Sequence, residues 1–233
     1  MNIMKTAFLS IFLYVILMNN SMKLMSQNKV SYLALGDSYT IGESVDEESR
    51  WPVVLTEQLN EFGLEVELKQ IIATTGWTTD ELLAAIDKGH DSLEQFDFGL
   101  VSLLIGVNNQ YRGYPIAQYE KEFEGLLKKS IQLSGNRPDK VFVVSIPDYG
   151  ITPFAAENNK DSKTVTEELF KYNTIAREIA LKYKVHFYDI TPLSLKAVKK
   201  PKQYLATDQL HPSAKMYSEW VDYMAAGVYQ QLK

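Results

Sequence analysis

Five short apolar segments alternate along the chain with five segments of helical periodicity, and this alternation limits the possible folds more than any other feature. The apolar segments cover residues 30–35, 64–72, 96–105, 140–146 and 185–190. Short apolar runs bounded by turn residues are typical of buried strands. Strands that alternate with helices favour a parallel sheet with helices on both faces. The sequence therefore predicts a three-layer α/β/α sandwich with a central parallel five-stranded sheet.

The segments between these strands carry helix signals. In residues 50–62, Pro52 lies near the start and Gly63 follows the end, as is common in helices. Residues 78–81 (Thr-Thr-Asp-Glu) have the pattern of a capping box and are expected to open a helix over residues 82–88. Further helices are expected over residues 115–133, 164–183 and 211–232, the last of them opened by His211 and Pro212.

The segment between the fourth strand and the next helix, residues 147–161, shows neither the periodicity of a helix nor that of a strand. Loops of this length are usually functional lids or rims. We therefore expect a long irregular loop beside a functional site.

Composition narrows the class of protein. The 233 residues, 45% of them hydrophobic, suit one well-buried domain, which we place at residues 28–233. The net charge of −5 and the lack of a basic run disfavour a nucleic-acid partner. The absence of Cys excludes disulfides, a cysteine nucleophile and lipid attachment at an N-terminal Cys. No cluster of His and carboxylates has metal-ligand spacing, so we expect neither a metal nor a cofactor.

The N-terminal region differs from the rest of the chain. Lys5 precedes an apolar run of 13 residues, which is short for a membrane span and typical of a secretory signal. We expect residues 1–25 to be a signal peptide, although no clear cleavage site follows; an uncleaved anchor is the alternative. A buried first helix is least favoured, because the domain pattern starts afresh at Val30. The protein is thus expected to be secreted or periplasmic, without stable membrane insertion after signal removal.

Ser38 follows the first predicted strand directly, within residues 36–39 (Gly-Asp-Ser-Tyr). A tight turn at Gly36 would deliver the Ser38 hydroxyl to the carboxyl end of the strand, where open α/β sheets bind ligands. Such a serine becomes a nucleophile only when a base and an oxyanion site can reach it.

Polar and glycine positions follow other strands too. Gly76 follows the second strand and Asn108 the third, while Asp208 and His211 follow the fifth. Because the carboxyl ends of parallel strands share one edge, residues about 170 positions apart can meet there. The spacing therefore predicts one site that contains Ser38, Gly76, Asn108, Asp208 and His211.

These positions resemble the SGNH (GDSL) hydrolase family, of the lysophospholipase L1-like esterase type. Four of its blocks occur in order: residues 36–39, Gly76, Gly106-x-Asn108 and Asp208-x-x-His211. They span residues 33–211, nearly the whole expected domain. The resemblance implies the flavodoxin-like SGNH fold and a serine ester hydrolase.

The resemblance also implies a role for each residue. Ser38 Oγ would attack the ester carbonyl, and His211 would take its proton and return it to the leaving alcohol. Asp208 would hold the imidazole and stabilise its charged form. The oxyanion would be met by the N–H groups of Ser38 and Gly76 and by the Asn108 amide, donors typically worth about 3–4 kcal/mol each.

Simpler explanations exist for each residue taken alone. Residues 36–39 could form an ordinary turn, Asn108 could be a loop residue, and Asp208 could pair with His211 by chance. Together they would require four coincidences at one sheet edge, so the catalytic interpretation is favoured over them. The remaining histidines, His90 and His186, are expected to be structural.

Two departures from familiar patterns matter. The resembled family commonly has Asp after the third-block Asn, where this chain has Asn109, and we expect local turn hydrogen bonding there. Residue 40 is Thr, so Ser38 is not in a G-x-S-x-G elbow, which argues against the α/β-hydrolase fold.

Aromatic residues and one arginine lie near the expected site: Trp77, Tyr111, Arg112 and Tyr114 are next to the oxyanion positions, and Tyr149 and Phe154 are in the long loop. Such residues could stack on a sugar or hold an anionic group of the substrate. Ordinary packing at the surface and rim explains them equally well. The substrate stays open among acetylated polysaccharides, short-chain esters, lysophospholipids and thioesters. An acyltransferase of the same fold and a non-catalytic binding protein are the alternatives to a hydrolase.

Overall fold

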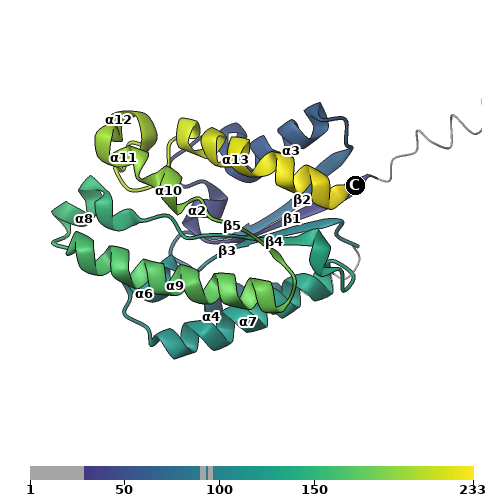
Figure 1. Cartoon of the computed structure of the whole chain (residues 1–233), viewed down its shortest axis with the longest axis horizontal. Helices are drawn as coiled ribbons and strands as arrows, with labels where there is room; N and C mark the ends of the chain where they lie inside the picture. Colours follow the sequence, from purple (N-terminus) through teal and green to yellow (C-terminus); the bar gives the residue numbers. More distant parts are fainter. Residues whose placement is uncertain (1–28, 90–92, 94–96) are drawn as a thin grey trace, which may run out of the picture.

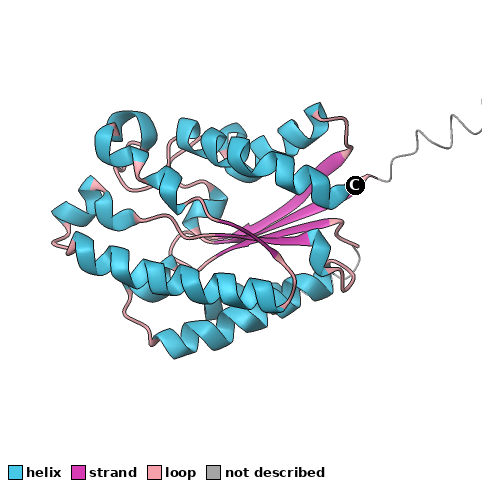
Figure 2. Cartoon of the chain, in the orientation of Figure 1, coloured by secondary structure: helices cyan, strands magenta, loops and turns pink. Residues whose placement is uncertain are grey.

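The structure, a computed structural model, describes residues 29–89, 93 and 97–233. Its five strands form one parallel sheet in the order β2-β1-β3-β4-β5 (Figures 1 and 2). The strands are β1 (Val30–Gly36), β2 (Val66–Ala73), β3 (Leu100–Leu104), β4 (Val141–Val144) and β5 (His186–Tyr188). The chain passes from β1 outward to β2 and then back across β1 to β3. The resulting switch point lies between the carboxyl ends of β1 and β3, where open α/β sheets bind ligands.

Helices cover both faces of the sheet, which confirms the predicted sandwich. On one face, α3 (Trp51–Glu61) packs against α13 (Ala214–Leu232). On the other face, α7 (Ile116–Leu133) lies between α4 (Thr79–Lys88) and α9 (Ser162–Lys182) (Figure 1). Because both faces are covered, every residue of β3 and β4 is buried, which accounts for their continuous apolar sequences.

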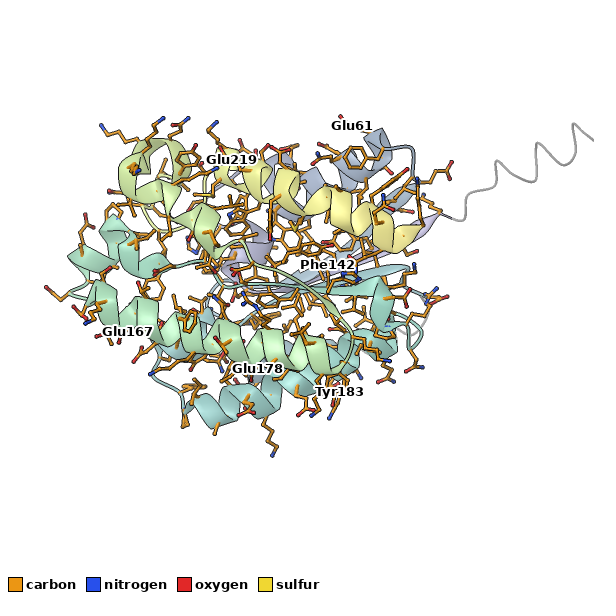
Figure 3. The ribbon with its side chains drawn as sticks, viewed as in Figure 1. Glu61, Phe142, Glu167, Glu178, Tyr183 and Glu219 are labelled. Atoms are coloured by element: carbon orange, nitrogen blue, oxygen red, sulfur yellow. The ribbon has the colours of Figure 1, made fainter. Side chains whose placement is uncertain are left out.

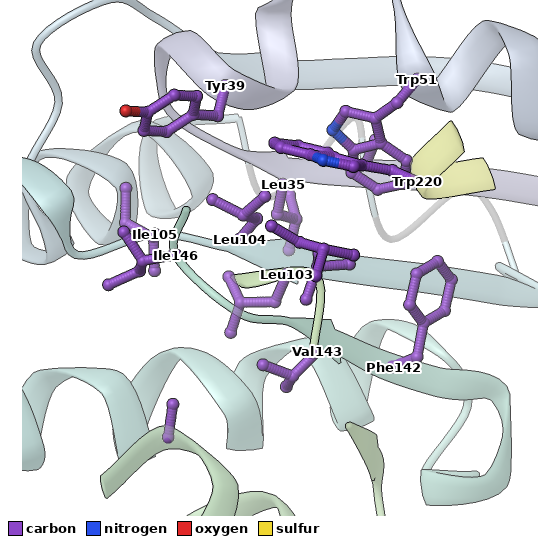
Figure 4. Close-up of a cluster of buried hydrophobic side chains, with 14 of the residues drawn as sticks. Leu35, Tyr39, Trp51, Leu103, Leu104, Ile105, Phe142, Val143, Ile146 and Trp220 are labelled. Atoms are coloured by element: carbon purple, nitrogen blue, oxygen red, sulfur yellow. The ribbon is translucent and has the colours of Figure 1, made fainter. Parts of the chain in front are cut away.

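Large side chains from both layers meet the sheet in the core. Trp51 and Trp220 lie on the same side of the sheet, and the rings of Trp51 and Phe142 are 6.2 Å apart (Figure 4). Each fully buried side chain of this size stabilises the fold by about 2 kcal/mol or more. Charged side chains lie instead on the outer surfaces of the helices, as those labelled in Figure 3 show: Glu61, Glu167, Glu178 and Glu219.

The start of the last helix differs from the prediction. Helix α13 begins at Ala214, and the Ser213 hydroxyl caps it by accepting the Met216 N–H at 3.3 Å. Pro212 instead pairs with Leu205 in an isolated antiparallel bridge. His211 therefore lies in a bend before the helix, because Ser213 is the better N-cap.

Several short helices were not expected. Two follow strands directly, α2 (Ser38–Ile41) after β1 and α6 (Val107–Tyr111) after β3. The expected irregular loop contains η3 (Tyr149–Ile151) and α8 (Pro153–Glu157), so it is more ordered than predicted. The remaining ones are η1 (Glu47–Ser49), η2 (Pro138–Lys140), α10 (Thr191–Ser194), α11 (Lys196–Lys199) and α12 (Pro201–Tyr204).

The capping box at Thr78 is present, and α4 begins at Thr79 rather than at residue 82. Within residues 29–89, 93 and 97–233, no helix is long and apolar enough to cross a membrane. The expected signal segment, residues 1–25, and His90 lie outside the described residues.

Candidate active site

The turn after β1 places Ser38 at the sheet edge. Gly36 ends the strand, and a Cβ atom there would come within 2.4 Å of the Leu104 carbonyl oxygen, so no larger residue fits. Asp37 caps α2 by accepting the Tyr39 N–H at 3.1 Å. Ser38 is the first residue of α2 and only 5% exposed. These constraints hold its hydroxyl at the base of a pocket.

Asp208 and His211 form a hydrogen-bonded pair. The His211 Nδ1 and Asp208 Oδ2 atoms are 2.6 Å apart, and the same carboxylate accepts the N–H groups of Leu210 and His211, both at 2.9 Å. The Ser44 hydroxyl also donates to Asp208 Oδ2, at 2.7 Å. Because an ionised carboxylate only accepts, His211 Nδ1 carries the proton and Nε2 is left as an acceptor.

The hydrogen bonds also decide the charge of Asp208. Partial burial raises the pKa of Asp208, but the hydrogen bonds from Ser44, His211 and two backbone N–H groups outweigh it and lower the pKa to about 2. The carboxylate is therefore ionised at every pH at which the protein would be assayed.

Packing holds the His211 ring beside the nucleophile turn. The ring is nearly buried and meets the Tyr39 ring edge-on at 5.4 Å. The His211 carbonyl accepts the Ala206 N–H at 2.8 Å, which ties down the segment before α13. Among the described residues, the Ser38 hydroxyl has no hydrogen-bond partner. In ligand-free sites such contacts are often long and tighten when substrate binds.

One pocket of about 200 Å³ joins the predicted residues. Its lining residues are Ser38, Tyr39, Thr75, Gly76, Val107, Asn108, Tyr111, Tyr149, Phe154, Leu210 and His211. Four of the five residues predicted to meet line this pocket, and the fifth, Asp208, bonds to His211. Sequence reasoning missed Thr75, Val107 and Leu210, although each adjoins a predicted residue.

Gly76 and Asn108, the residues predicted to meet the oxyanion, both line the pocket. Gly76 has a φ of 88°, a left-handed conformation that favours glycine. The Asn108 Nδ2 group donates to the Trp77 carbonyl at 2.9 Å. An amide group has two hydrogens, so the second can serve a ligand in the pocket. Because Trp77 directly follows Gly76, this hydrogen bond holds the Asn108 side chain beside the Gly76 turn.

Arg112 contacts the turn of Gly76 and does not line the pocket. Its Nη2 donates to the Gly76 carbonyl at 2.6 Å, and its Nη1 donates to Glu81 Oε1 at 3.3 Å. Trp77 and Tyr114 do not line the pocket either. Of the four aromatic or arginine residues next to the expected oxyanion positions, Tyr111 alone lines the pocket. Arg112 instead holds the turn at Gly76 through the Gly76 carbonyl.

The far end of the pocket is apolar. Tyr111 packs against Tyr149 and Phe154, with ring centroids 5.9 and 6.4 Å away. The Tyr149 hydroxyl donates to Gln110 Oε1 at 2.9 Å, and Gln110 donates to Glu168 at 2.6 Å. The pocket wall at this end is thus aromatic, and hydrogen bonds hold one of its rings in place.

Asn109 departs from the expected local turn bonding. It is fully buried, its Oδ1 accepts the Thr79 N–H at 3.0 Å, and its Nδ2 donates to Thr79 Oγ1 at 2.7 Å. These bonds cross 30 positions and join α6 to the start of α4. The side chain therefore fixes two elements of the site relative to each other.

The remaining histidine that is described, His186, is exposed in β5 and does not line the pocket. Within the described chain, no three His, Asp or Glu side chains are grouped closely enough to hold a metal ion.

Comparison with known proteins identifies the family. The GDSL-like Lipase/Acylhydrolase family matches residues 34–218, and the chain belongs to this family of ester-bond hydrolases. An arylesterase from Vibrio mimicus is 31% identical over 128 residues, which are 54% of this chain and 60% of that protein. The match thus spans less than two thirds of this curated relative.

Solved structures share the fold at low identity. The lipase/acylhydrolase from Enterococcus faecalis has a TM-score of 0.66 at 20% identity, covering 88% of this chain and 97% of its own. The lipase Lip_vut3 from a goat rumen metagenome has a TM-score of 0.67 at 19% identity, covering 88% and 100%. Axe2, an acetyl xylan esterase from Geobacillus stearothermophilus, has a TM-score of 0.61 at 19% identity, covering 85% and 94%.

Proposed function

We propose that this protein is a serine ester hydrolase that forms an acyl-enzyme on Ser38. The observation that carries the proposal is the shared pocket of Ser38, Gly76, Asn108 and His211, with Asp208 bonded behind the imidazole. These are the groups that acyl transfer needs: a nucleophile, a base, a partner for the base and oxyanion donors.

The steps follow from the positions of the atoms. Ser38 Oγ attacks the ester carbonyl carbon while its proton passes to His211 Nε2. The oxyanion accepts hydrogen bonds from the N–H groups of Ser38 and Gly76 and from Asn108 Nδ2. Collapse breaks the bond to the alcohol, which leaves with the proton from His211. Water then attacks the acyl-enzyme by the same route and releases the acid.

The pocket favours esters with a compact apolar group. Val107, Tyr111, Tyr149, Phe154 and Leu210 make its far end aromatic and aliphatic, and about 200 Å³ admits a short acyl chain or one aromatic ring. The similarity to an arylesterase supports an aryl ester as one such substrate. We further propose that the enzyme acts outside the cytoplasm, from the apolar N-terminal run.

The test is hydrolysis of p-nitrophenyl acetate, butyrate and octanoate by residues 28–233 and by Ser38→Ala. We expect activity on the acetate and butyrate, and a loss of at least about a thousand-fold in the variant. Ser162→Ala, at an exposed serine that begins α9, should retain wild-type activity. Equal rates for wild type and Ser38→Ala on all three esters would contradict the proposal.

A further inference from the structure

The turn after α2 is bonded to the backbone of the nucleophile residue. The N–H groups of Gly42 and Glu43 both donate to the Ser38 carbonyl, at 3.1 and 3.0 Å. Gly42 has a φ of 71° and Ser44 a φ of 66°. A left-handed conformation suits Gly42 but costs free energy at Ser44, which has a Cβ atom.

The side chains of this turn reach two other parts of the site. Ser44 Oγ donates to Asp208 Oδ2 at 2.7 Å, across 164 positions. Glu43 accepts a hydrogen bond from the hydroxyl of Thr75, the neighbour of Gly76. One strained turn therefore touches the nucleophile residue, the carboxylate behind the base and the oxyanion turn.

On the basis of the proposed function, we infer that Ser44 is a positioning residue that orients Asp208 toward His211. In the part of the chain that the structure describes, every other hydrogen bond to Asp208 comes from Leu210 or His211. Those bonds all lie within residues 208–211. Ser44 bonds the carboxylate from outside this segment, and it links Asp208 to the turn that is bonded to the Ser38 carbonyl. This link adds to the packing of His211 against Tyr39.

The exposure of Asp208 explains why such a link is needed. The Asp208 side chain is 30% exposed, so water competes for its oxygens. The Ser44 hydroxyl takes a lone pair of Oδ2 and leaves this oxygen facing His211 Nδ1. Backbone strain is retained at functional sites where the surrounding structure holds it, and the strained φ of Ser44 has this role here.

The experiment compares Ser44→Gly and Ser44→Ala with wild type. Both remove the hydroxyl, but glycine also relieves the left-handed backbone, so Ser44→Gly should unfold at no lower temperature than wild type. We expect kcat for p-nitrophenyl acetate to fall about ten-fold in both variants, as loss of one hydrogen bond to a charged group predicts, with KM changed less than two-fold. Asn136→Gly, which relieves a positive φ of 60° elsewhere, is the matched control and should keep wild-type kcat.

A double-mutant cycle shows whether Ser44 acts through Asp208. In an Asp208→Asn background, Ser44→Gly should lower kcat by less than two-fold. An undiminished ten-fold loss in that background, or a wild-type kcat for Ser44→Gly, would overturn the inference. A second measurement distinguishes a failure of this inference from a failure of the proposed function. It is the rate at which phenylmethylsulfonyl fluoride labels Ser38, followed by mass spectrometry. If wild type is labelled but hydrolyses no ester, slower labelling of Ser44→Gly still supports the inference, and equal labelling contradicts it.

Discussion

Two carboxyl groups beside the pocket have opposite pKa shifts. Hydrogen bonds lower the pKa of Asp208 to about 2, despite partial burial. Burial raises the pKa of Asp37 to about 7, because the backbone hydrogen bonds from Tyr39 and Gly106 offset only part of the desolvation. Asp208 is therefore a permanent anion behind His211, while Asp37, next to Ser38, titrates near neutral pH.

We expect Asp37→Asn to make the protein more stable than wild type at pH 8. The folded pKa of about 7 lies above the unfolded value of about 3.9. Between these values the folded state binds more protons, so this group makes stability fall as pH rises, by up to about 1.4 kcal/mol per pH unit. Asn keeps the acceptor for the Tyr39 N–H and carries no charge.

Urea unfolding at pH 4, 5.5, 7 and 8 measures this effect as the difference in unfolding free energy between variant and wild type. The difference should grow from pH 4 to pH 7 and then level off. Asp222→Asn, at an exposed position on α13, is the control. A difference that stays constant from pH 4 to pH 8 would show that Asp37 does not titrate in this window.

At the level of elements, a chain of three polar side chains joins α6, α4 and α7. Asn109 Nδ2 donates to Thr79 Oγ1, and the Thr79 hydroxyl in turn donates to Glu122. The Thr79 hydroxyl has a single hydrogen, and Glu122 accepts it. Asn109 does not compete for that hydrogen, because its amide donates to the Thr79 oxygen instead. The asparagine is thus matched to Glu122, which explains how this chain tolerates Asn where its family commonly has Asp.

We therefore expect Asn109→Asp to destabilise the protein by about 1–3 kcal/mol. Two carboxylates would then compete for one hydroxyl hydrogen, so one carboxylate oxygen would lose its hydrogen bond and would lie beside a second negative charge. Adding Glu122→Gln should recover most of the loss, because the new amide can donate to the Thr79 oxygen. Thermal or urea unfolding of both single variants and the double variant measures this coupling, and additive effects of the two changes would contradict it.

At the scale of the whole molecule, the pocket exists because the connections after all five strands converge. Phe154 follows β4, Leu210 follows β5, and Val107 follows β3, yet all three line the cavity with Ser38. The Phe154 N–H also donates to the Gln209 carbonyl at 3.4 Å, so the segment after β4 contacts the His211 segment. We therefore expect α8 and its neighbours, rather than the turn after β1, to limit the size of the group that the pocket admits.

Phe154→Ala should shift selectivity toward longer acyl chains, because removing the ring extends the apolar end of the pocket. We expect the ratio of kcat/KM for p-nitrophenyl octanoate to that for the acetate to rise on the order of ten-fold. Phe170→Ala, at a side chain that is 71% exposed and outside this pocket, is the matched control. An unchanged ratio in Phe154→Ala would show that the acyl chain binds elsewhere.

Local patterns in the sequence were sufficient for the sheet, the main helices and the set of residues that meet at its edge. The apolar runs, the capping box at Thr78 and the glycine at residue 36 act over a few positions, so their signals can be recognised without a partner. The start of α13 was mispredicted because Pro212 and Ser213 are both acceptable helix starts locally. The bridge between Leu205 and Pro212 decided between them.

The sequence by itself determined the order of elements, and hence that Ser38, Gly76, Asn108 and His211 share one sheet edge. Only the tertiary structure decided what Arg112, Asn109 and Ser44 do, because their partners lie 30 to 164 positions away. Turn and helix preferences are local, whereas a hydrogen bond between side chains depends on distances and directions that exist only after the layers pack. The chemistry of the pocket follows from strand order, and its fine positioning follows from these long-range contacts.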